Sequence, residues 1–267
     1  MPVTSQWAYA YGHLDVTVVV LASPADEVRT QLKPHMHLAA QSLTPAGTHP
    51  QVLLFGQHSR VRSRFDQGGA GGHYDEWIIA TPFLEWVDAQ GRATPWTTMS
   101  RLYLNSLWYT ALGWTYGYPK ELARISVPPN GYHVHTLPGG EPRVDMQWQA
   151  AGPQMPWTQF ARATAIASVF SQPFIDQLGP LPWLGSRMWF ELDLGTMQPA
   201  TVQAQIQDGC APNFPGRLLD VGSIEGGVPG AFRLSCDWML SRPYLAGSLP
   251  PQLRLAMPPD YEITPHA

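Results

Sequence analysis

The sequence predicts one α+β domain, residues 1–267, built on a curved or closed β-sheet with a few helices. Its 27 prolines and 24 glycines cut the chain into short pieces, which favours strands over long helices. Most of the segments with a regular pattern are strand-like in composition. No linker or low-complexity run divides the chain, and 267 residues are enough for one large domain.

Eight segments are predicted to be strands, because they are short, rich in β-branched and aromatic residues, and bounded by turn residues. In chain order they are residues 14–21, 51–55, 74–80, 132–137, 144–149, 188–194, 201–206 and 232–240. Residues 74–80 are typical, because Tyr74, Glu76, Ile78 and Ala80 recur with a period of two and so share one face. Glu76 therefore shares its side of the strand with apolar residues.

Three segments are predicted to be helices, at residues 26–32, 99–113 and 158–171. The first is supported by Pro24 and Asp26, which suit the start and first turn of a helix.

The composition excludes some partners. The net charge is −4 with scattered basic residues, which gives no electrostatic footprint for nucleic acid. Charged residues make up only 13% of the chain, about half the usual share. A surface with so little charge suggests that subunits cover one another, so we expect a homo-oligomer.

Nothing in the sequence indicates a membrane or an export signal. The apolar stretch at residues 16–22 is too short to span a bilayer and has no basic flank. Cys210 and Cys236 are too few for a disulfide framework and have no metal or redox spacing. We therefore expect a cytoplasmic protein that does not bind membranes.

Only two lysines occur, Lys33 and Lys120, and the second ends an aromatic run that begins at Trp108. An amine among rings is poorly hydrated, which favours the neutral nucleophile that forms a Schiff base with a carbonyl. A free lysine has a pKa of about 10.4, so nucleophilic action near neutral pH requires a pKa roughly 3 units lower. We expect Lys120 to be buried with a destabilised ammonium form, and Lys33 to be exposed. The bland alternative is that Lys120 is a solvated side chain after a Tyr-Pro turn.

Two motifs resemble the acetoacetate decarboxylase family. Tyr118-Pro119-Lys120, followed by an apolar pair at residues 122–123, resembles the family's reactive-lysine segment. Upstream, Gly72-x-Tyr74-x-Glu76 with Pro82 six residues later resembles the segment that carries the acidic partner of that lysine. The resemblance covers most of the chain. It implies a cone-like barrel, a Schiff-base reaction at Lys120, and no cofactor or metal.

The chain also departs from the family pattern. Where the family has Gly-Arg-Glu before the lysine, this chain has Leu112, Gly113 and Trp114, and the usual second lysine is Glu121. The family's early arginine has no clear counterpart at residues 13–14, and its early glutamate appears as Gly56 or Gln57. These substitutions are typical of a divergent member that keeps the amine with a different substrate. In an extended chain Glu121 would face away from the amine beside it.

The candidate catalytic residues are therefore Lys120 as nucleophile and Glu76 as the carrier of protons at the imine. The candidate substrate-binding residues are Trp114, Tyr116 and Tyr118, which alternate before Pro119 and would wall one side of a pocket, together with Tyr74. Ordinary core packing is the alternative for these rings.

Two other clusters of side chains are weaker candidates for a functional site. His133 and His135 would share one strand face, with His58 or His73 to complete a metal set, but such a pair is usually structural. Arg60, Arg62 and Arg64 would project to one side of an extended segment and could hold a substrate carboxylate, although a solvated strand face is the more common explanation of such a pattern.

Two functions remain. One is a lyase that forms a Schiff base at Lys120 and decarboxylates a β-keto acid, or performs aldol condensation and dehydration on another keto acid. The other is a non-catalytic binding protein for an apolar carbonyl compound. Retention of both Lys120 and Glu76 favours the lyase.

Overall fold

The computed structural model describes residues 8–63, 71–87, 93–176 and 183–245. Nine long or medium strands form its framework. They are β1 Ala8–Pro24, β3 Thr48–Ser63, β4 Gly72–Val87, β5 Ala93–Leu104, β6 Lys120–Ser126, β7 Gly131–Thr136, β8 Pro142–Ala150, β13 Thr196–Ile206 and β15 Gly230–Ser241.

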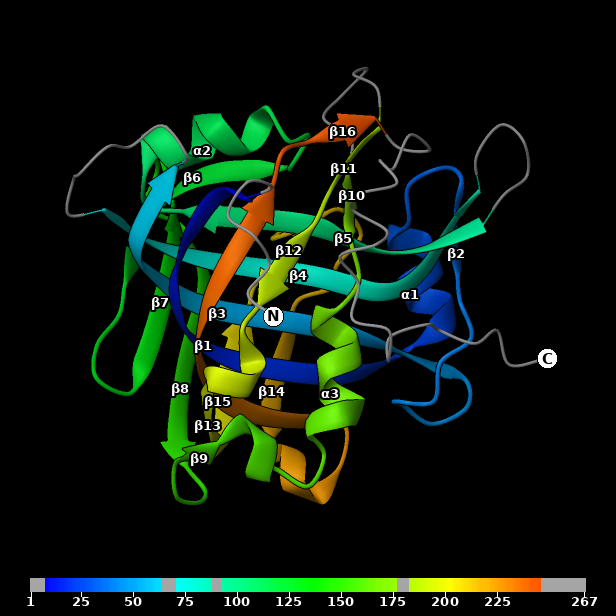
Figure 1. Cartoon of the computed structure of the whole chain (residues 1–267), viewed down its shortest axis with the longest axis vertical. Helices are drawn as coiled ribbons and strands as arrows, with labels where there is room; N and C mark the ends of the chain where they lie inside the picture. The colour runs from blue at the N-terminus through cyan, green and yellow to red at the C-terminus, as the bar shows by residue number, and fades with distance from the viewer. Residues whose placement is uncertain (1–7, 64–70, 88–92, 177–182, 246–267) are drawn as a thin grey trace.

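These nine strands pair in a closed ring, in the order β5, β6, β7, β8, β13, β15, β1, β3, β4 and back to β5 (Figure 1). Neighbours in the ring are antiparallel except β5 and β6, which run parallel with Leu102 opposite Lys120. The predicted α+β fold with a closed sheet is confirmed. Closure removes free strand edges from the ring, which stabilises a long sheet against edge-to-edge association.

Shorter elements surround the ring. β2 Met36–Leu38 pairs with β4, and β12 Met188–Phe190 pairs with β15. β10 Phe174–Asp176 pairs in parallel with β5 and antiparallel with β11 Leu184–Ser186, which in turn pairs antiparallel with β16 Tyr244–Leu245. β9 Met155–Pro156 and β14 Arg217–Val221 pair with β13. The α-helices are α1 Ala25–Gln31, α2 Leu107–Trp114 and α3 Ala163–Phe170, and the 3-10 turns are η1 Trp157–Gln159, η2 Leu192–Leu194 and η3 Ile224–Gly226.

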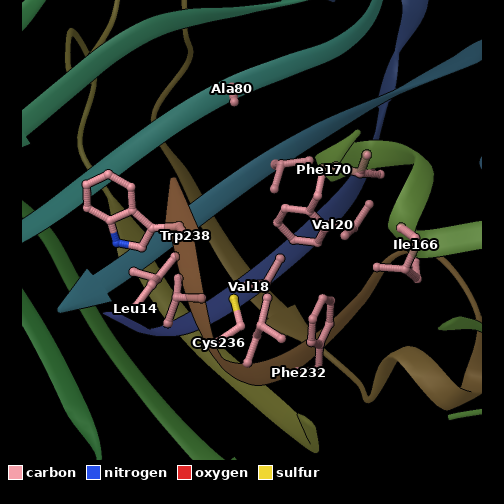
Figure 2. Packing of buried hydrophobic residues seen from close by; sticks show 14 of the residues in the cluster. Leu14, Val18, Val20, Ala80, Ile166, Phe170, Phe232, Cys236 and Trp238 are labelled. Atoms are coloured by element: carbon pink, nitrogen blue, oxygen red, sulfur yellow. The ribbon is translucent and has the colours of Figure 1, made fainter. Parts of the chain in front are cut away.

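The core has two main layers. An inner cluster takes side chains from all nine ring strands, so it fills the barrel: Val19, Leu53, Trp77, Tyr103, Ala123, Val134, Val144, Val202 and Ala231. An outer cluster covers the other face of β1, β4 and β15, where Val18, Val20, Ala80, Phe232, Cys236 and Trp238 pack with Ile166 and Phe170 of α3 (Figure 2).

Side chains alternate between these layers along each strand. On β4, Trp77 and Ile79 belong to the inner cluster, whereas Tyr74 and Ala80 belong to the outer one. Glu76 therefore points to the outer face, toward α2 and β6, rather than into the barrel.

Several sequence predictions need correction. Residues 99–113 are not one helix, because β5 continues to Leu104 by pairing with β4 and β6, and α2 starts only at Leu107. The segment's apolar residues fit a strand paired on both sides. The helix expected at 158–171 is η1 followed by α3, and the strand expected at 188–194 ends at Phe190. β6 was missed as a strand. The first helix lies within one residue of its predicted bounds.

Within the described residues, no helix is long and apolar enough to cross a membrane.

Candidate active site

Lys120 is the first residue of β6, directly after the turn that follows α2. The turn is closed by hydrogen bonds from the Tyr116 and Tyr118 backbone N–H groups to the Gly113 carbonyl oxygen. The lysine stem then runs back across α2 at Gly113. A Cβ on that glycine would lie 2.1 Å from Lys120 Cδ and 2.3 Å from Cε, so only glycine leaves room for the stem.

The amine meets the predicted carboxylate. Lys120 Nζ lies 3.2 Å from Glu76 Oε1, and the two side chains are only 8% and 5% exposed. The two residues come close because β4 and β6 pair with opposite edges of the same strand, β5. Glu76 lies opposite Leu104 of β5, and Lys120 lies opposite Leu102. The predicted burial of Lys120 and its proximity to Glu76 are both present.

A third buried polar residue completes the group. His58 of β3 is 4% exposed at its side chain, and its Nε2 lies 3.2 Å from Glu76 Oε2. The sequence pointed to His58 only as a possible metal ligand. The strand prediction in this region stopped at residue 55, so the alternation that places His58 beside Glu76 was not followed to its end.

The three residues set the charge of the carboxylate. Burial favours the neutral acid and raises the pKa of Glu76, but the Lys120 ammonium and the His58 hydrogen bond outweigh burial. The pKa of Glu76 is therefore held below its ordinary value, and the group is ionised at neutral pH.

Aromatic rings surround the amine. Lys120 Nζ lies 5.8 Å from the ring centroid of Tyr74 and 5.9 Å from that of Tyr118, within the range of cation–π attraction. Tyr74 stacks on His58 at 11° between planes and meets Tyr109 at a tilt of 31°, with both ring-centroid distances 4.4 Å. Burial, with Glu76 nearby, raises the pKa of Tyr74 well above its ordinary value, so its phenol stays neutral.

Two of the other predicted binding residues lie elsewhere. Trp114 is 44% exposed and donates its indole N–H to the Lys120 carbonyl oxygen at 3.0 Å, so its indole contacts the lysine's backbone. Tyr116 is buried against Tyr9 and Tyr118. The expected alternation of these rings was wrong because Trp114 ends a helix and Tyr116 lies in a turn. Tyr118 hydrogen-bonds through its hydroxyl to Ser186.

Glu121 lies on the other side of β6 and pairs with Arg101 of β5. This agrees with the expectation that adjacent side chains of an extended segment diverge, and it keeps the second carboxylate away from the Lys120 amine.

Lys33 is not the freely exposed lysine that the sequence suggested. Its side chain is 29% exposed, and its Nζ lies 2.8 Å from Oδ1 of the fully buried Asp176. Its loop folds back onto β10, which local sequence does not reveal.

The arginine and histidine clusters are separate from this site. Arg60 pairs with Asp237 at 2.9 Å and sits in a bulge with φ of 53°, so the expected alternation with Arg62 is broken; Arg64 lies outside the described residues. His133 pairs with Asp145, and His135 contacts the Gly140 carbonyl oxygen. The described residues hold no group of three or more metal-ligating side chains.

Both cysteines are free thiols in the structure. They are buried, and burial raises the pKa of each to about 12. Neither thiol is therefore a ready nucleophile.

No family model matches the chain, and no curated protein matches it. Solved structures do. The enduracididine biosynthesis enzyme MppR complexed with pyruvate superimposes with a TM-score of 0.61 at 15% identity, over 88% of this chain and 89% of that one. A structure of acetoacetate decarboxylase gives 0.60 at 12% identity, over 92% and 93%. An acetoacetate decarboxylase-like enzyme from Sphingomonas wittichii RW1 gives 0.57 at 14% identity, over 92% and 97%. The chain therefore has the acetoacetate decarboxylase-like fold.

Proposed function

We propose that this protein is a lyase that forms a Schiff base between Lys120 and a keto acid. The observation that carries the proposal is the buried amine 3.2 Å from the buried carboxylate of Glu76. A desolvated lysine beside a group that can take its proton is an arrangement suited to attack on a carbonyl. The fold supports the same chemistry, because structures that share it include acetoacetate decarboxylase and a pyruvate complex of MppR.

Glu76 has a place in each proton transfer. The Lys120 ammonium gives a proton to Glu76, and the freed nitrogen lone pair forms a bond to the carbonyl carbon. As that bond forms, the carbonyl π pair moves to oxygen, and a proton passes from the nitrogen to that oxygen to give the carbinolamine. Glu76 then returns its proton to the carbinolamine hydroxyl, which leaves as water, and the iminium remains on Lys120. A carboxylate in contact with the amine can serve both steps, because the same atom accepts and donates.

The iminium then acts as the electron sink. In a β-keto acid the bond to the carboxylate carbon breaks, carbon dioxide leaves, and the bonding pair forms an enamine that takes a proton on carbon. In another keto acid, loss of a proton beside the iminium gives an enamine that attacks an aldehyde, and loss of water follows.

The surroundings favour an apolar substrate. The rings of Tyr74 and Tyr118 face the Lys120 amine. Within the described residues, the charged side chain that pairs with this amine is Glu76. Among the ion pairs of the described residues, Glu76 has Lys120 and His58 as its partners and no arginine.

A binding protein for an apolar carbonyl compound is the second candidate. It is favoured by the position of Glu121, which faces Arg101 and replaces the second cation that the family resemblance implies. Such a protein would bind a carbonyl compound in the aromatic site without converting it. We also propose, from composition, a homo-oligomeric cytoplasmic protein.

Turnover separates the two candidates. The wild type and Lys120→Ala are incubated with a panel of keto acids, with and without an aldehyde, and carbon dioxide and products are measured by gas analysis and NMR. We expect at least one keto acid to be consumed by the wild type and none by Lys120→Ala. Binding without consumption across the panel would favour the binding protein.

A further inference from the structure

His58 contacts the Glu76 carboxylate on the side opposite Lys120. It lies on β3 opposite Tyr74, and its Nε2 lies 3.2 Å from Glu76 Oε2, the oxygen that does not face Lys120. The carboxylate is thus held at both oxygens, by an amine on one side and an imidazole on the other. All three side chains are less than a tenth exposed.

The geometry assigns the proton on the imidazole. An ionised carboxylate can only accept hydrogen bonds, so Nε2 must carry the hydrogen and donate it to Glu76. The other ring nitrogen, Nδ1, is buried and has no hydrogen-bond partner among the described residues. An unpartnered Nδ1 is tolerable as a lone pair and costly as an N–H. The neutral ring with hydrogen on Nε2 therefore fits the site.

The ring is fixed by packing. It stacks on Tyr74 at 11° between planes and meets Trp238 edge-on at 84°. A bulge follows directly, because the pairing of β3 with β4 shifts between His58 and Val61. Bulges redirect strands and the side chains next to them, and here the redirected stretch begins just after the imidazole.

We propose that His58 is a positioning residue that keeps Glu76 ionised and aims its free oxygen at the Lys120 amine. This inference rests on the proposed Schiff-base function for its catalytic consequence, but not for its structural one. The His58 N–H stabilises the ionised carboxylate that must take the amine's proton.

The groups that face His58 allow its effect on the ionisation of Glu76 to be measured. On β4 they are Glu76 and the neutral phenol of Tyr74, on β15 the indole of Trp238, and on β1 the paired Leu14. Lys120 lies beyond Glu76. Glu76 is therefore the one charged neighbour of the imidazole among these groups. Removing the His58 N–H should change the ionisation of Glu76 before that of any other of them.

Matched variants separate hydrogen bonding from packing. His58→Gln keeps an N–H near the position of Nε2, His58→Met has similar length without a donor, and His58→Phe keeps the stacked ring without a donor. Glu76 ionisation is followed by infrared titration of protein with 13C-labelled glutamate carboxyls, with Glu76→Gln to assign the band. Circular dichroism and thermal melting check that each variant folds.

We expect the Met and Phe variants to protonate Glu76 at higher pH than the wild type, and the Gln variant to stay close to it. If the imine forms, its trapping rate at neutral pH falls about tenfold in the Met and Phe variants, and the acid limb of its pH profile moves up. Unchanged Glu76 titration in whichever of the two donor-free variants folds, or equal losses in Gln and Met, would overturn the assignment. A wild type that traps no keto acid would defeat the Schiff-base function while the infrared titration still decides the role of His58.

Discussion

The Lys120 side chain runs past Gly113, and its path depends on that residue having no side chain. Gly113 lies in α2, where alanine normally stabilises a helix by about 0.5–1 kcal/mol relative to glycine. At this position, however, the added methyl group would overlap the Lys120 stem at 2.1 Å from Cδ. The fold can tolerate such a methyl if the lysine moves, so the effect should fall on the amine and not on the helix.

Gly113→Ala should therefore keep the melting temperature within a few degrees of the wild type and slow imine formation at Lys120. Gly222→Ala is the control, because no atom lies within 4 Å of its added Cβ. Borohydride trapping and thermal melting are measured on all three proteins. Equal trapping by Gly113→Ala and the wild type would show that the close fit of Lys120 against α2 does not matter.

Glu76→Gln should lower turnover by about 100-fold or more, the typical contribution of a positioned proton carrier. Substrate affinity should change much less, because Glu76 contacts the amine and not the aromatic walls. Steady-state kinetics and equilibrium binding with the same keto acid measure the two effects. A variant that binds weakly but turns over normally would assign Glu76 to binding.

The sequence predicted part of this residue-level arrangement. Lys120 and Glu76 were identified from motifs, and the aromatic surroundings of the amine followed from the run before it. His58 was not identified as a partner of Glu76, because the contact joins β3 to β4 across eighteen positions of sequence and depends on their register. Trp114 was misplaced for a local reason, since a helix end replaced the expected extended chain.

At the scale of elements, β5 and α2 show why the amine could not be placed from pattern alone. Residues 99–113 contain an apolar run that suits a helix or a buried strand. Pairing with β4 and β6 on both sides decides in favour of the strand up to Leu104. The remaining residues form the connection that lets β6 run parallel to β5, and such a connection needs a dozen or more residues.

A second buried ion pair joins peripheral elements. Asp176 ends β10 and accepts hydrogen bonds from Lys33, from the Thr98 hydroxyl and from the Met99 backbone N–H. Burial raises the pKa of Asp176 above its ordinary value, although these donors act in the opposite direction. The carboxylate therefore depends on Lys33 for its compensation.

Lys33→Met should destabilise the fold by about 3 kcal/mol at neutral pH, because it leaves a buried carboxylate without its cation. A carboxyl whose pKa is higher in the folded than in the unfolded state favours folding as pH falls, so the deficit should shrink toward acid pH. Urea denaturation at pH 7.5 and pH 5 measures it. A deficit that stays constant with pH would mean that lost packing, and not charge, causes it; Lys33→Arg, which keeps a cation, is the control.

At the scale of the whole molecule, the sequence predicted the fold class and most strands, and closure of the sheet was expected from the family resemblance. The sequence did not predict the outer layer of side chains or that the site lies in it. The amine, Glu76 and His58 lie on the face of the strands outside the barrel, a position set by which side of each strand faces the inner cluster. Self-association also stays a prediction, supported by the low share of charged residues and by the exposure of Leu107 and Trp108 on α2.

Substrate choice depends on several elements, because they place aromatic rings around the amine and against one another. Tyr74 of β4, Tyr118 of the turn before β6 and Tyr109 of α2 present ring surfaces. We expect acetoacetate to be a poor substrate, and aryl- or alkyl-substituted keto acids to be better. Each buried methylene adds roughly 0.8 kcal/mol of binding. Carbon dioxide release at equal concentrations compares them, and efficient turnover of acetoacetate with no gain for larger compounds would contradict this.

The proposed imine at Lys120 can be tested directly because the chain has only two lysines. In Lys33→Arg, Lys120 is the only lysine left in the chain. This protein is treated with a substituted keto acid and borohydride, then measured by intact mass and peptide mapping, with Lys33→Arg/Lys120→Arg as the control. We expect one adduct on the peptide that contains Lys120, equal to the mass of the trapped carbonyl compound less one oxygen atom, and none in the control. No adduct with any keto acid of the panel, or an adduct that persists at the chain's amino terminus in the control, would contradict it.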